Sequence, residues 1–516
     1  MRTDNSIKNS ISSLIGNMIS YLVAFVAQAI FIRILGAEYL GLNGLFTNIL
    51  SMLSIFELGI GSAIVYNMYK PISENDVEKI KSLMLFYKKA YTLIMIVIGT
   101  LGLIALPFLK YIVGEITVDV NIYYVYLLFL ASTVMSYFMT YKRNLIIANQ
   151  RNYIINIIHM LYLISLNIAQ LLIIYLTKNY YVYLLLKVIY QLFENLIINY
   201  IANKEYGFIK GNDGKKLDKT TEKDIFSRVK ALFFHKIGLI IVLGTDNIII
   251  SKFFGIITVV LYNNYSTIIN GITTLFSQVI TSTTASVGNL IVSKDNKKKY
   301  NVFKKLRFIN FWISTLTATC LLVIVQPFVS VWAGKEYLLA TNVVIMLTFN
   351  YFQMMQRQTY FTFKDSAGIW IEDKYVPLVE AILNIVFSII CLKIFGLVGV
   401  FMGTFISSLT HWCYSYPKFI YKKLFNRSYT QYIKETTGYV ALFIVIAAIT
   451  YEISTLIILN NLILQILVSA VISLIIHNTI MFLIFRKSEN FEYFAELLKK
   501  ILKKLYGKIS KKDYEC

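Results

Sequence analysis

The chain has 516 residues, of which 57% are hydrophobic and 15% charged, and its mean hydropathy is +0.63. A soluble protein of this length could not bury that much apolar surface, so the composition excludes a soluble domain and predicts a membrane protein. The net charge of +22 would suit nucleic-acid binding only if the positive side chains were gathered into one patch.

Long apolar segments follow one another along the whole chain. A helix needs roughly 20 apolar residues to cross the hydrocarbon layer, and about fourteen stretches have this character. They lie near residues 11–32, 42–66, 84–107, 122–141, 153–176, 181–202, 231–251, 258–290, 308–327, 338–362, 375–394, 396–416, 436–457 and 459–485. The first contains Asn17, Ser20 and Gln28 and lacks a small-residue cleavage signature, so we expect a retained span rather than a signal peptide.

The distribution of positive charge predicts the orientation of these spans. With fourteen spans, 41 of the 50 Lys and Arg residues fall on the side of the N-terminus, six fall on the opposite side, and three lie within spans. This bias predicts that both termini are cytoplasmic. Because the charges are scattered over loops that face anionic lipid, we expect membrane lipids and no nucleic acid among the partners.

The second half of the chain repeats the first at an offset of 219 to 222 residues. Leu35-Gly36 returns as Phe254-Gly255, and Thr140-Tyr141-Lys142 returns as Thr362-Phe363-Lys364. Six predicted spans lie in each repeat, so both repeats begin in the cytoplasm and are parallel. A duplicated helical bundle of this kind is typical of carriers.

The repeat and the polar segments predict the domain organisation of an all-α polytopic membrane protein. An N-terminal six-helix lobe (1–203) is followed by a cytoplasmic connector (204–230), a C-terminal six-helix lobe (231–422), two extra spans (423–485) and a basic tail (486–516). The tail suits an amphipathic helix on the inner leaflet, or a solvated positive segment that enforces topology.

Motifs for catalysis, cofactors and metals are missing from the sequence. None of its four cysteines falls in an external loop, so neither a disulfide framework nor a metal site is expected. The sequence has no G-x-x-x-x-G-K-[ST], H-E-x-x-H or G-x-S-x-G motif. We therefore expect a protein that is not an enzyme and needs no cofactor.

Segment 258–290 is too polar to face lipid. Asn263 and Asn270 recur with Ser277 and Thr284 every seven residues and so share one helix face. We expect this face to line a hydrated cavity between the halves. The alternative is that small hydroxyl residues only allow close packing of helices.

Several ionisable or amide side chains fall within predicted spans, where they are costly and tend to face a pathway or a partner. Span 231–251 carries Lys236 and Asp246, and Lys236 lies close enough to the cytoplasmic end to reach the headgroups instead. In span 338–362, Asn350, Gln353 and Arg357 form one polar stripe. Arg357 is a candidate phosphate ligand or a structural residue near the interface.

Two further spans contribute candidate residues. Lys187 and Glu194 share a face of span 181–202 but are too far apart for direct contact. Glu57 precedes Gly59 and Gly61 and could be an acid in the cavity or one half of an interhelical ion pair. The candidate substrate-binding set is Glu57, Lys187, Lys236, Asp246, Asn263, Asn270, Asn350, Gln353 and Arg357.

Three runs of residues resemble bacterial Wzx-type polysaccharide flippases of the multidrug/oligosaccharidyl-lipid/polysaccharide (MOP) exporter superfamily. They are Gly36-Ala37-Glu38-Tyr39-Leu40-Gly41-Leu42, Glu57-Leu58-Gly59-Ile60-Gly61-Ser62-Ala63 and Thr245-Asp246-Asn247-Ile248-Ile249-Ile250-Ser251. The resemblance implies a V-shaped pair of six-helix bundles in the cytoplasmic membrane of a bacterium. It also implies export of undecaprenyl-diphosphate-linked oligosaccharide for capsule, O-antigen or teichoic-type polymers.

Under this interpretation Lys187, Lys236 and Arg357 would supply cations to the diphosphate, and the Asn, Ser and Thr side chains would bind the glycan. The expected partners are the lipid-linked substrate, membrane lipids and, in the same pathway, a polysaccharide polymerase and glycosyltransferases. Four alternatives stay open at this point: a peptidoglycan-precursor flippase, a cation-coupled multidrug antiporter, a scaffold of a polysaccharide-assembly complex, and a membrane glycosyltransferase. A glycosyltransferase would need catalytic groups on a sizeable extramembrane loop, and the predicted external loops are short.

Overall fold

The computed structural model describes residues 2–53, 57, 60–113, 118–149, 151–209, 211, 214–281, 283–291, 295–369, 372–496 and 499. The side chains of Asn17, His235 and Lys236 fall outside the described part, as do Gly59 and most of the predicted basic tail. Within these ranges every regular element is helical. The predicted all-α class is confirmed.

Eight helices are long and apolar enough to cross a membrane, or nine if Ile122–Tyr137 and Thr140–Ala148 form one bent span. The chain is therefore a multi-pass membrane protein, but the expected number of fourteen spans is not confirmed. Part of the difference comes from short helices such as α2 (Ala37–Leu53), whose seventeen residues rise only about 26 Å, less than the hydrocarbon thickness. Helix α16 (Leu397–Thr410) is counted apart from the π-helix η5 (His411–Leu424), which follows it without a gap.

Packing divides the chain into two compact units. Unit 1 comprises residues 1–264 and 374–407, and unit 2 comprises residues 265–373 and 408–516. This division differs from that of the sequence repeat, because α10 (Lys219–Phe254) and α15 (Val376–Phe395) pack against each other within unit 1. The predicted domain limits, which follow the repeat, stay a prediction.

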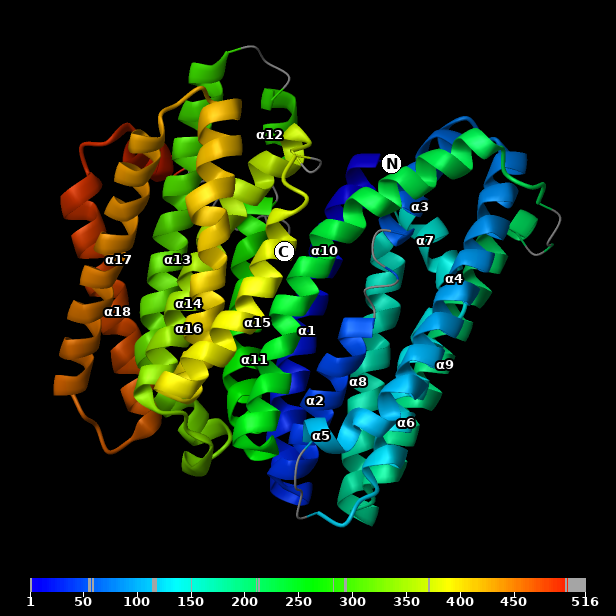
Figure 1. Ribbon diagram of the computed structural model, residues 1–516, viewed down its shortest axis with the longest axis horizontal. Helices are drawn as coiled ribbons and strands as arrows, with labels where there is room; N and C mark the ends of the chain where they lie inside the picture. Colours follow the sequence, from blue (N-terminus) through cyan, green and yellow to red (C-terminus); the bar gives the residue numbers. More distant parts are fainter. Residues whose placement is uncertain are drawn as a thin grey trace, which may run out of the picture. The chain divides into compact units, whose positions relative to one another are not determined.

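Unit 1 is a bundle of long helices with short breaks (Figure 1). It contains α1 (Arg2–Leu35), α2, α3 (Ile60–Ser73), α4 (Val77–Ala105), η2 (Leu106–Phe108), α5 (Leu109–Val113), α6 (Ile122–Tyr137), α7 (Thr140–Ala148), α8 (Asn152–Thr177), α9 (Tyr180–Glu205), η3 (Gly207–Ile209), α10, the start of α11 (Ile256–Thr281), α15 and most of α16. Helix α9 packs against α6 and α8, and α6 packs against α4. One hydrophobic core of the unit includes buried side chains of α4 and α7, among them Leu83, Tyr87 and Leu145.

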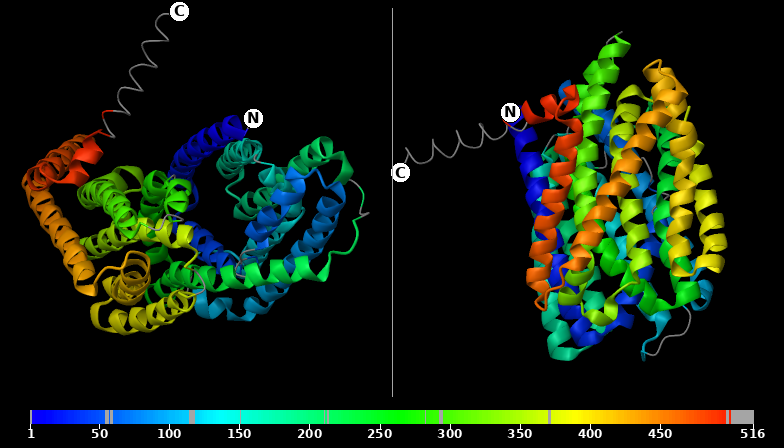
Figure 2. Two further views of the ribbon diagram at one scale, coloured as in Figure 1. Left: turned by 90° about the horizontal axis from the view of Figure 1, so that it is seen from above. Right: turned by 90° about the vertical axis from the view of Figure 1, so that its left-hand side faces the viewer.

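Unit 2 is built around α13 (Asn296–Trp332). It also contains the rest of α11, α12 (Thr284–Ile291), η4 (Lys335–Tyr337), α14 (Thr341–Ala367), the π-helix η5 (His411–Leu424), α17 (Tyr429–Leu456) and α18 (Leu462–Phe485). Helices α17 and α18, coloured orange to red in Figure 2, coincide with the two predicted extra spans and both pack against α13. An aromatic cluster around Phe303, Tyr360 and Tyr421 has edge-to-face ring contacts, the arrangement that ring quadrupoles favour.

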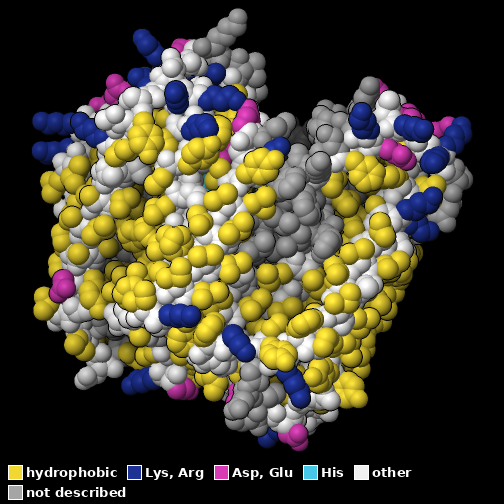
Figure 3. All heavy atoms as spheres, in the orientation of Figure 1, with side chains coloured by type: hydrophobic (Ala, Val, Ile, Leu, Met, Phe, Trp, Pro, Cys, Tyr) yellow, Lys and Arg dark blue, Asp and Glu magenta, His cyan; other side chains and the backbone are white. Residues whose placement is uncertain are grey.

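The polar end of unit 1 is ordered by side-chain caps. Asp76 accepts a hydrogen bond from the Lys79 amide at the start of α4, and Asp218 accepts one from the Thr221 amide at the start of α10. Lys79 also pairs with Asp218, and this contact holds the pKa of that exposed carboxyl well below its usual range. Because of this cap, helix α10 begins inside the predicted connector. Figure 3 shows Lys and Arg gathered mainly near this end of the unit, beside a largely hydrophobic flank.

Helices α15 and α16 approach each other through two glycines spaced four residues apart. A Cβ at Gly399 would lie 2.1 Å from the Cys391 carbonyl oxygen, and one at Gly403 would lie 2.3 Å from the Ser388 nitrogen. This spacing of small residues is the motif that lets membrane helices pack backbone to backbone.

We expect Gly403→Ala to lower the free energy of unfolding by about 3 kcal/mol, because the added methyl overlaps the α15 backbone. The measurement is reversible SDS unfolding of the purified protein. The control is Gly438→Ala in α17, where a Cβ would meet nothing within 4 Å and helix propensity predicts a gain of up to about 1 kcal/mol. Equal stability of the two variants would contradict the close approach.

Candidate transport site

The nine candidate residues are divided between the two units. Glu57, Lys187, Asp246 and Asn263 belong to unit 1, together with Lys236, whose side chain lies outside the described part. Asn270, Asn350, Gln353 and Arg357 belong to unit 2. The expectation that the candidate residues of both units line one cavity stays a prediction.

In unit 1, Asp246 lies in a buried polar network that joins α10, α15 and α16. The Thr404 hydroxyl donates to the Asp246 carboxylate at 3.4 Å, and Asn384 Nδ2 donates to the Thr404 hydroxyl at 3.1 Å. The Thr245 hydroxyl donates in turn to Asn384 Oδ1 at 3.0 Å. Asp246 is only 5% exposed, and no described cation lies within ion-pair distance of it. A proton or a bound cation would neutralise this carboxylate at low cost, whereas a bare charge there is expensive.

Asn263 packs against α2 at a glycine. A Cβ at Gly44 would lie 1.9 Å from Asn263 Nδ2, so a larger residue there would require the amide to move. The neighbouring Asn264 is fully buried, and its Oδ1 accepts a hydrogen bond of 2.5 Å from Gln28 Nε2 on α1. These amides connect α1, α2 and α11 within unit 1.

Lys187 extends toward an aromatic ring rather than a carboxylate. Its Nζ lies 4.9 Å from the centroid of Phe129 on α6, which is a cation–π distance. The nearby Glu194 instead accepts from Arg143 Nη2 at 3.0 Å and lies 3.0 Å from His159 Nδ1. The expectation that Lys187 and Glu194 make no direct contact agrees with these partners.

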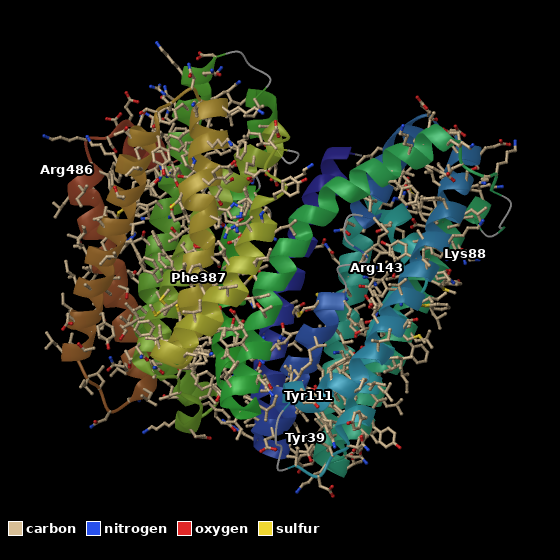
Figure 4. The ribbon with its side chains drawn as sticks, in the orientation of Figure 1. Tyr39, Lys88, Tyr111, Arg143, Phe387 and Arg486 are labelled. Atoms are coloured by element: carbon tan, nitrogen blue, oxygen red, sulfur yellow. The ribbon has the colours of Figure 1, made fainter. Side chains whose placement is uncertain are left out.

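Glu57 connects to a residue that the sequence analysis missed. The Tyr91 hydroxyl donates to Glu57 Oε1 at 3.4 Å, and Asn144 Nδ2 donates to the Tyr91 hydroxyl at 3.0 Å. Asn144 and Arg143 both lie on α7, and Figure 4 labels Arg143 within unit 1. The sequence analysis places the charges of residues 142–151 outside the predicted spans, on the side of the N-terminus. Their position at the start of a helix that directly follows an apolar span was the signal available in the sequence.

In unit 2, the predicted stripe on α14 meets aromatic side chains. Trp412 Nε1 donates to Gln353 Oε1 at 2.9 Å. Arg357 Nε donates to the Tyr416 hydroxyl at 3.2 Å, and its guanidinium lies 5.3 Å from the Phe361 centroid. Asn350 is half-buried one turn before Gln353. The residues of this stripe present amide and guanidinium groups, which suit hydroxyl and phosphate ligands.

The predicted polar face of α11 is bonded largely to its own helix. Asn270 is exposed and its Nδ2 donates to Ser266 Oγ at 3.2 Å. The Thr274 and Thr281 hydroxyls donate to the carbonyls of Asn270 and Ser277, four residues earlier. These bonds satisfy the hydroxyl protons without water and fit the packing alternative, while the Asn270 amide stays accessible.

A second buried cation of unit 2 was also missed. Arg307 on α13 is 2% exposed and lies 3.3 Å from Glu435 on α17, and its Nη1 donates to the Tyr421 hydroxyl at 2.6 Å. The guanidinium lies 4.9 Å from the Tyr439 centroid. This network pairs the charge of Arg307 and ties α17 to the core of unit 2. We therefore assign Arg307 a structural role.

The chemistry available in both units is hydrogen bonding and charge pairing. Among the described residues no group of three His, Cys, Asp or Glu could hold a metal ion. The polar groups of these helices include hydroxyls, amides, carboxylates and cations. Such groups bind hydroxyl-rich or phosphorylated ligands.

Comparison with known proteins gives one family and one fold. The model of the family described as "Polysaccharide biosynthesis protein" matches residues 6–287, which is more than half of the chain. A lipid II flippase MurJ structure in an inward closed conformation aligns over 93% of this chain and 99% of that chain, with a TM-score of 0.69 and 12% identity. No curated protein sequence matches the chain.

Two transporters of the MOP superfamily have the same fold. An inward-facing MATE family multidrug resistance transporter aligns over 78% of this chain and 94% of that chain, with a TM-score of 0.57 and 14% identity. A MOP superfamily transporter from Pyrococcus furiosus aligns over 79% and 93%, with a TM-score of 0.51 and 14% identity. At these identities the likeness establishes the fold alone, and it confirms the predicted MOP-type architecture.

The Arg143–Glu194 pair predicts a measurable contribution to stability. We expect Glu194→Gln to lower the free energy of unfolding by about 3 kcal/mol, because Glu194 is 1% exposed at its side chain and Arg143 would lose its carboxylate. The control on the same helix is Glu205→Gln. Its pair with Arg151 is largely solvated, and its loss should cost about 0.5 kcal/mol. Similar losses for both variants in SDS unfolding would contradict this assignment.

Proposed function

Because the chain belongs to the polysaccharide biosynthesis protein family, we propose that it is a flippase for undecaprenyl-diphosphate-linked oligosaccharides. The match of the family model over residues 6–287 carries the proposal. In this role the protein moves repeat units from the cytoplasmic to the outer leaflet of a bacterial cytoplasmic membrane, with both termini cytoplasmic. The polyprenyl chain stays in lipid, and only the polar headgroup crosses. The protein makes and breaks no covalent bond and is not an enzyme.

The membrane-depth side chains supply the contacts that such a headgroup needs. Arg357 can donate two parallel hydrogen bonds to a phosphate, and Lys187 adds a point charge. Gln353, Asn350 and Asn270 offer the mixed donors and acceptors that sugar hydroxyls bind. A polymerase and glycosyltransferases of the same pathway are the proposed protein partners.

Two other transport functions have an observation in their favour. The fold aligns with a lipid II flippase over nearly its whole length, which favours a peptidoglycan-precursor substrate. The buried Asp246 carboxylate, whose contacts come from a hydroxyl, favours a cation-coupled multidrug antiporter. A scaffold role has no comparable support.

Depletion of the protein tests these functions against one another. We expect lipid-linked oligosaccharide to accumulate in the inner leaflet, with little of it reaching an impermeant lectin or periodate added to protoplasts. Accumulation of the peptidoglycan precursor instead would identify the alternative substrate. Unchanged distribution of both intermediates, together with increased sensitivity to cationic drugs, would support the antiporter and overturn the proposal.

Arg357 is the candidate for contact with the diphosphate. We expect Arg357→Ala to lower polymer export about tenfold or more, because a hydrogen bond to a charged group contributes roughly 1.5–3 kcal/mol. Export is measured as surface polymer per inserted protein. The control is Arg486→Ala, an exposed position just after α18 that Figure 4 labels, which should export normally. Normal export by a correctly inserted Arg357→Ala variant would remove this role.

A further inference from the structure

Unit 1 has a break between α6 and α7 that opens a polar cavity. Helix α6 ends at Tyr137, and α7 begins at Thr140 at an angle of 42°. Met139 between them has a left-handed backbone, with φ of 62°. A cavity of about 380 Å³ opens beside this break, with a lining that includes Lys88, Tyr91, Tyr137, Lys142 and Asn199. At about 30 Å³ per water molecule, it has room for on the order of ten waters or for a ligand the size of a diphosphate.

Lys142 is the buried cation of this cavity. It is 8% exposed, and its Nζ donates to Asn199 Oδ1 at 2.6 Å and to Asn203 Oδ1 at 2.8 Å. Both acceptors are neutral amides of α9. Within the described ranges no carboxylate lies within ion-pair distance of Lys142. A buried ammonium that lacks a counter-ion is costly, so the site is electrostatically incomplete without an anion.

In the second sequence repeat, the corresponding buried lysine has a carboxylate as its counter-ion. Lys364, the counterpart of Lys142 at an offset of 222 residues, is 1% exposed and forms an ion pair with Asp373. The Ser415 hydroxyl also donates to that carboxylate, at 2.9 Å. At the position of unit 1 that corresponds to Asp373, the chain carries Arg151. The first repeat therefore replaces the acid with a base, and that base pairs elsewhere, with Glu205.

The backbone differs between the repeats at the same place. Helix α14 continues without a break through Tyr360 and Phe361, the counterparts of Phe138 and Met139. In unit 1 the chain bends there and the cavity forms. The cavity therefore occurs in the repeat where Lys142 has no carboxylate partner among the described residues, and the unbroken helix occurs in the repeat where Lys364 pairs with Asp373.

The other charged residue in the described lining of the cavity is also positive. Lys88 on α4, labelled in Figure 4, brings a second ammonium, and the lining residues that the structure describes include no Asp or Glu. Helix α7 begins beside the cavity without a side-chain cap, so the positive end of its dipole lies at the cavity wall. Tyr91, Tyr137 and Asn199 also line the cavity, where the Tyr91 hydroxyl is bonded to Glu57 and Asn144 and the Asn199 oxygen accepts from Lys142.

We propose that this cavity binds a phosphate-bearing anion, with the Lys142 ammonium as its counter-ion. The ligand chemistry is that of a phosphate or diphosphate group, carried by an anionic lipid headgroup or by a water-soluble phosphate. The site is separate from the Arg357 stripe and belongs to unit 1 alone. It would let an anion stabilise the bent form of the α6–α7 segment.

The test uses the full-length protein in neutral detergent and in lipid nanodiscs. Thermal unfolding is followed with sodium pyrophosphate against sodium chloride of equal ionic strength, and in phosphatidylglycerol against phosphatidylcholine nanodiscs. We expect pyrophosphate or phosphatidylglycerol to raise the unfolding temperature of the wild-type protein. A response to pyrophosphate alone identifies a soluble or diphosphate ligand, and a response to phosphatidylglycerol alone identifies a lipid headgroup. No response to either probe overturns the proposal.

Substitutions of Lys142 distinguish an anion-binding role of this residue from a purely structural one. Lys142→Gln removes the charge and keeps a polar amide, so the apparent affinity for the responding probe should fall at least tenfold, while the unfolding temperature without the probe stays equal or rises. Lys142→Arg should retain binding. The matched control is Lys364→Gln combined with Asp373→Asn, which alters the counterpart in the second repeat and should leave the response intact.

Two results would contradict the proposal outright. One is a Lys142→Gln protein that responds to the probe as the wild type does. The other is a Lys142→Gln protein that loses stability in the absence of any probe, as a purely structural donor to Asn199 and Asn203 would. Neither readout involves polymer export, so failure here leaves the proposed flippase activity standing and tested separately.

Discussion

Inside a bilayer a polar side chain has no water to bind, and this constraint governs where the charges of this protein lie. Each buried ionisable group must find a partner within the chain, a ligand, or a proton. Arg307 meets the constraint with Glu435 and Tyr421, and Glu194 meets it with Arg143. Groups that the fold satisfies completely act as structural ties. Groups that it satisfies only in part are the ones that are available to a ligand.

Helix α7 shows how one short segment serves several partners. Three consecutive polar residues follow the break after α6. Lys142 reaches the amides of α9, Arg143 reaches the carboxylate of Glu194 on the same helix, and Asn144 reaches Tyr91 on α4. Because successive residues of a helix are about 100° apart, the three side chains leave α7 in different directions. The short helix that follows the bend at Met139 therefore connects α9 to α4 within unit 1.

The sequence predicted features that depend on composition and on the length of apolar segments. It missed features that depend on contacts between residues far apart in the sequence. Apolar length predicted the helical membrane class, and the two extra spans appear as α17 and α18. The predicted number of fourteen spans stays unconfirmed, because apolar composition does not reveal where a helix stops. The partners of Arg143 and Asn144 lie 51 and 53 residues away, so their burial could not be predicted from local pattern. The Thr274 and Thr281 hydroxyls of α11 bond to carbonyls of their own helix, while the predicted cavity-facing role of the neighbouring Asn270 stays a prediction.

The two sequence repeats differ in how they neutralise a buried lysine at the same position. A duplicated bundle starts with two equal copies of each polar site, and each copy is then free to diverge while the other maintains the fold. At Lys364 the pair with Asp373 neutralises the charge within the helix bundle. At Lys142 the acid is replaced by Arg151, and the helix that continues in α14 is broken between α6 and α7. The two neutral amides that Lys142 contacts do not neutralise its charge, and an anion from outside the chain is the simplest compensation.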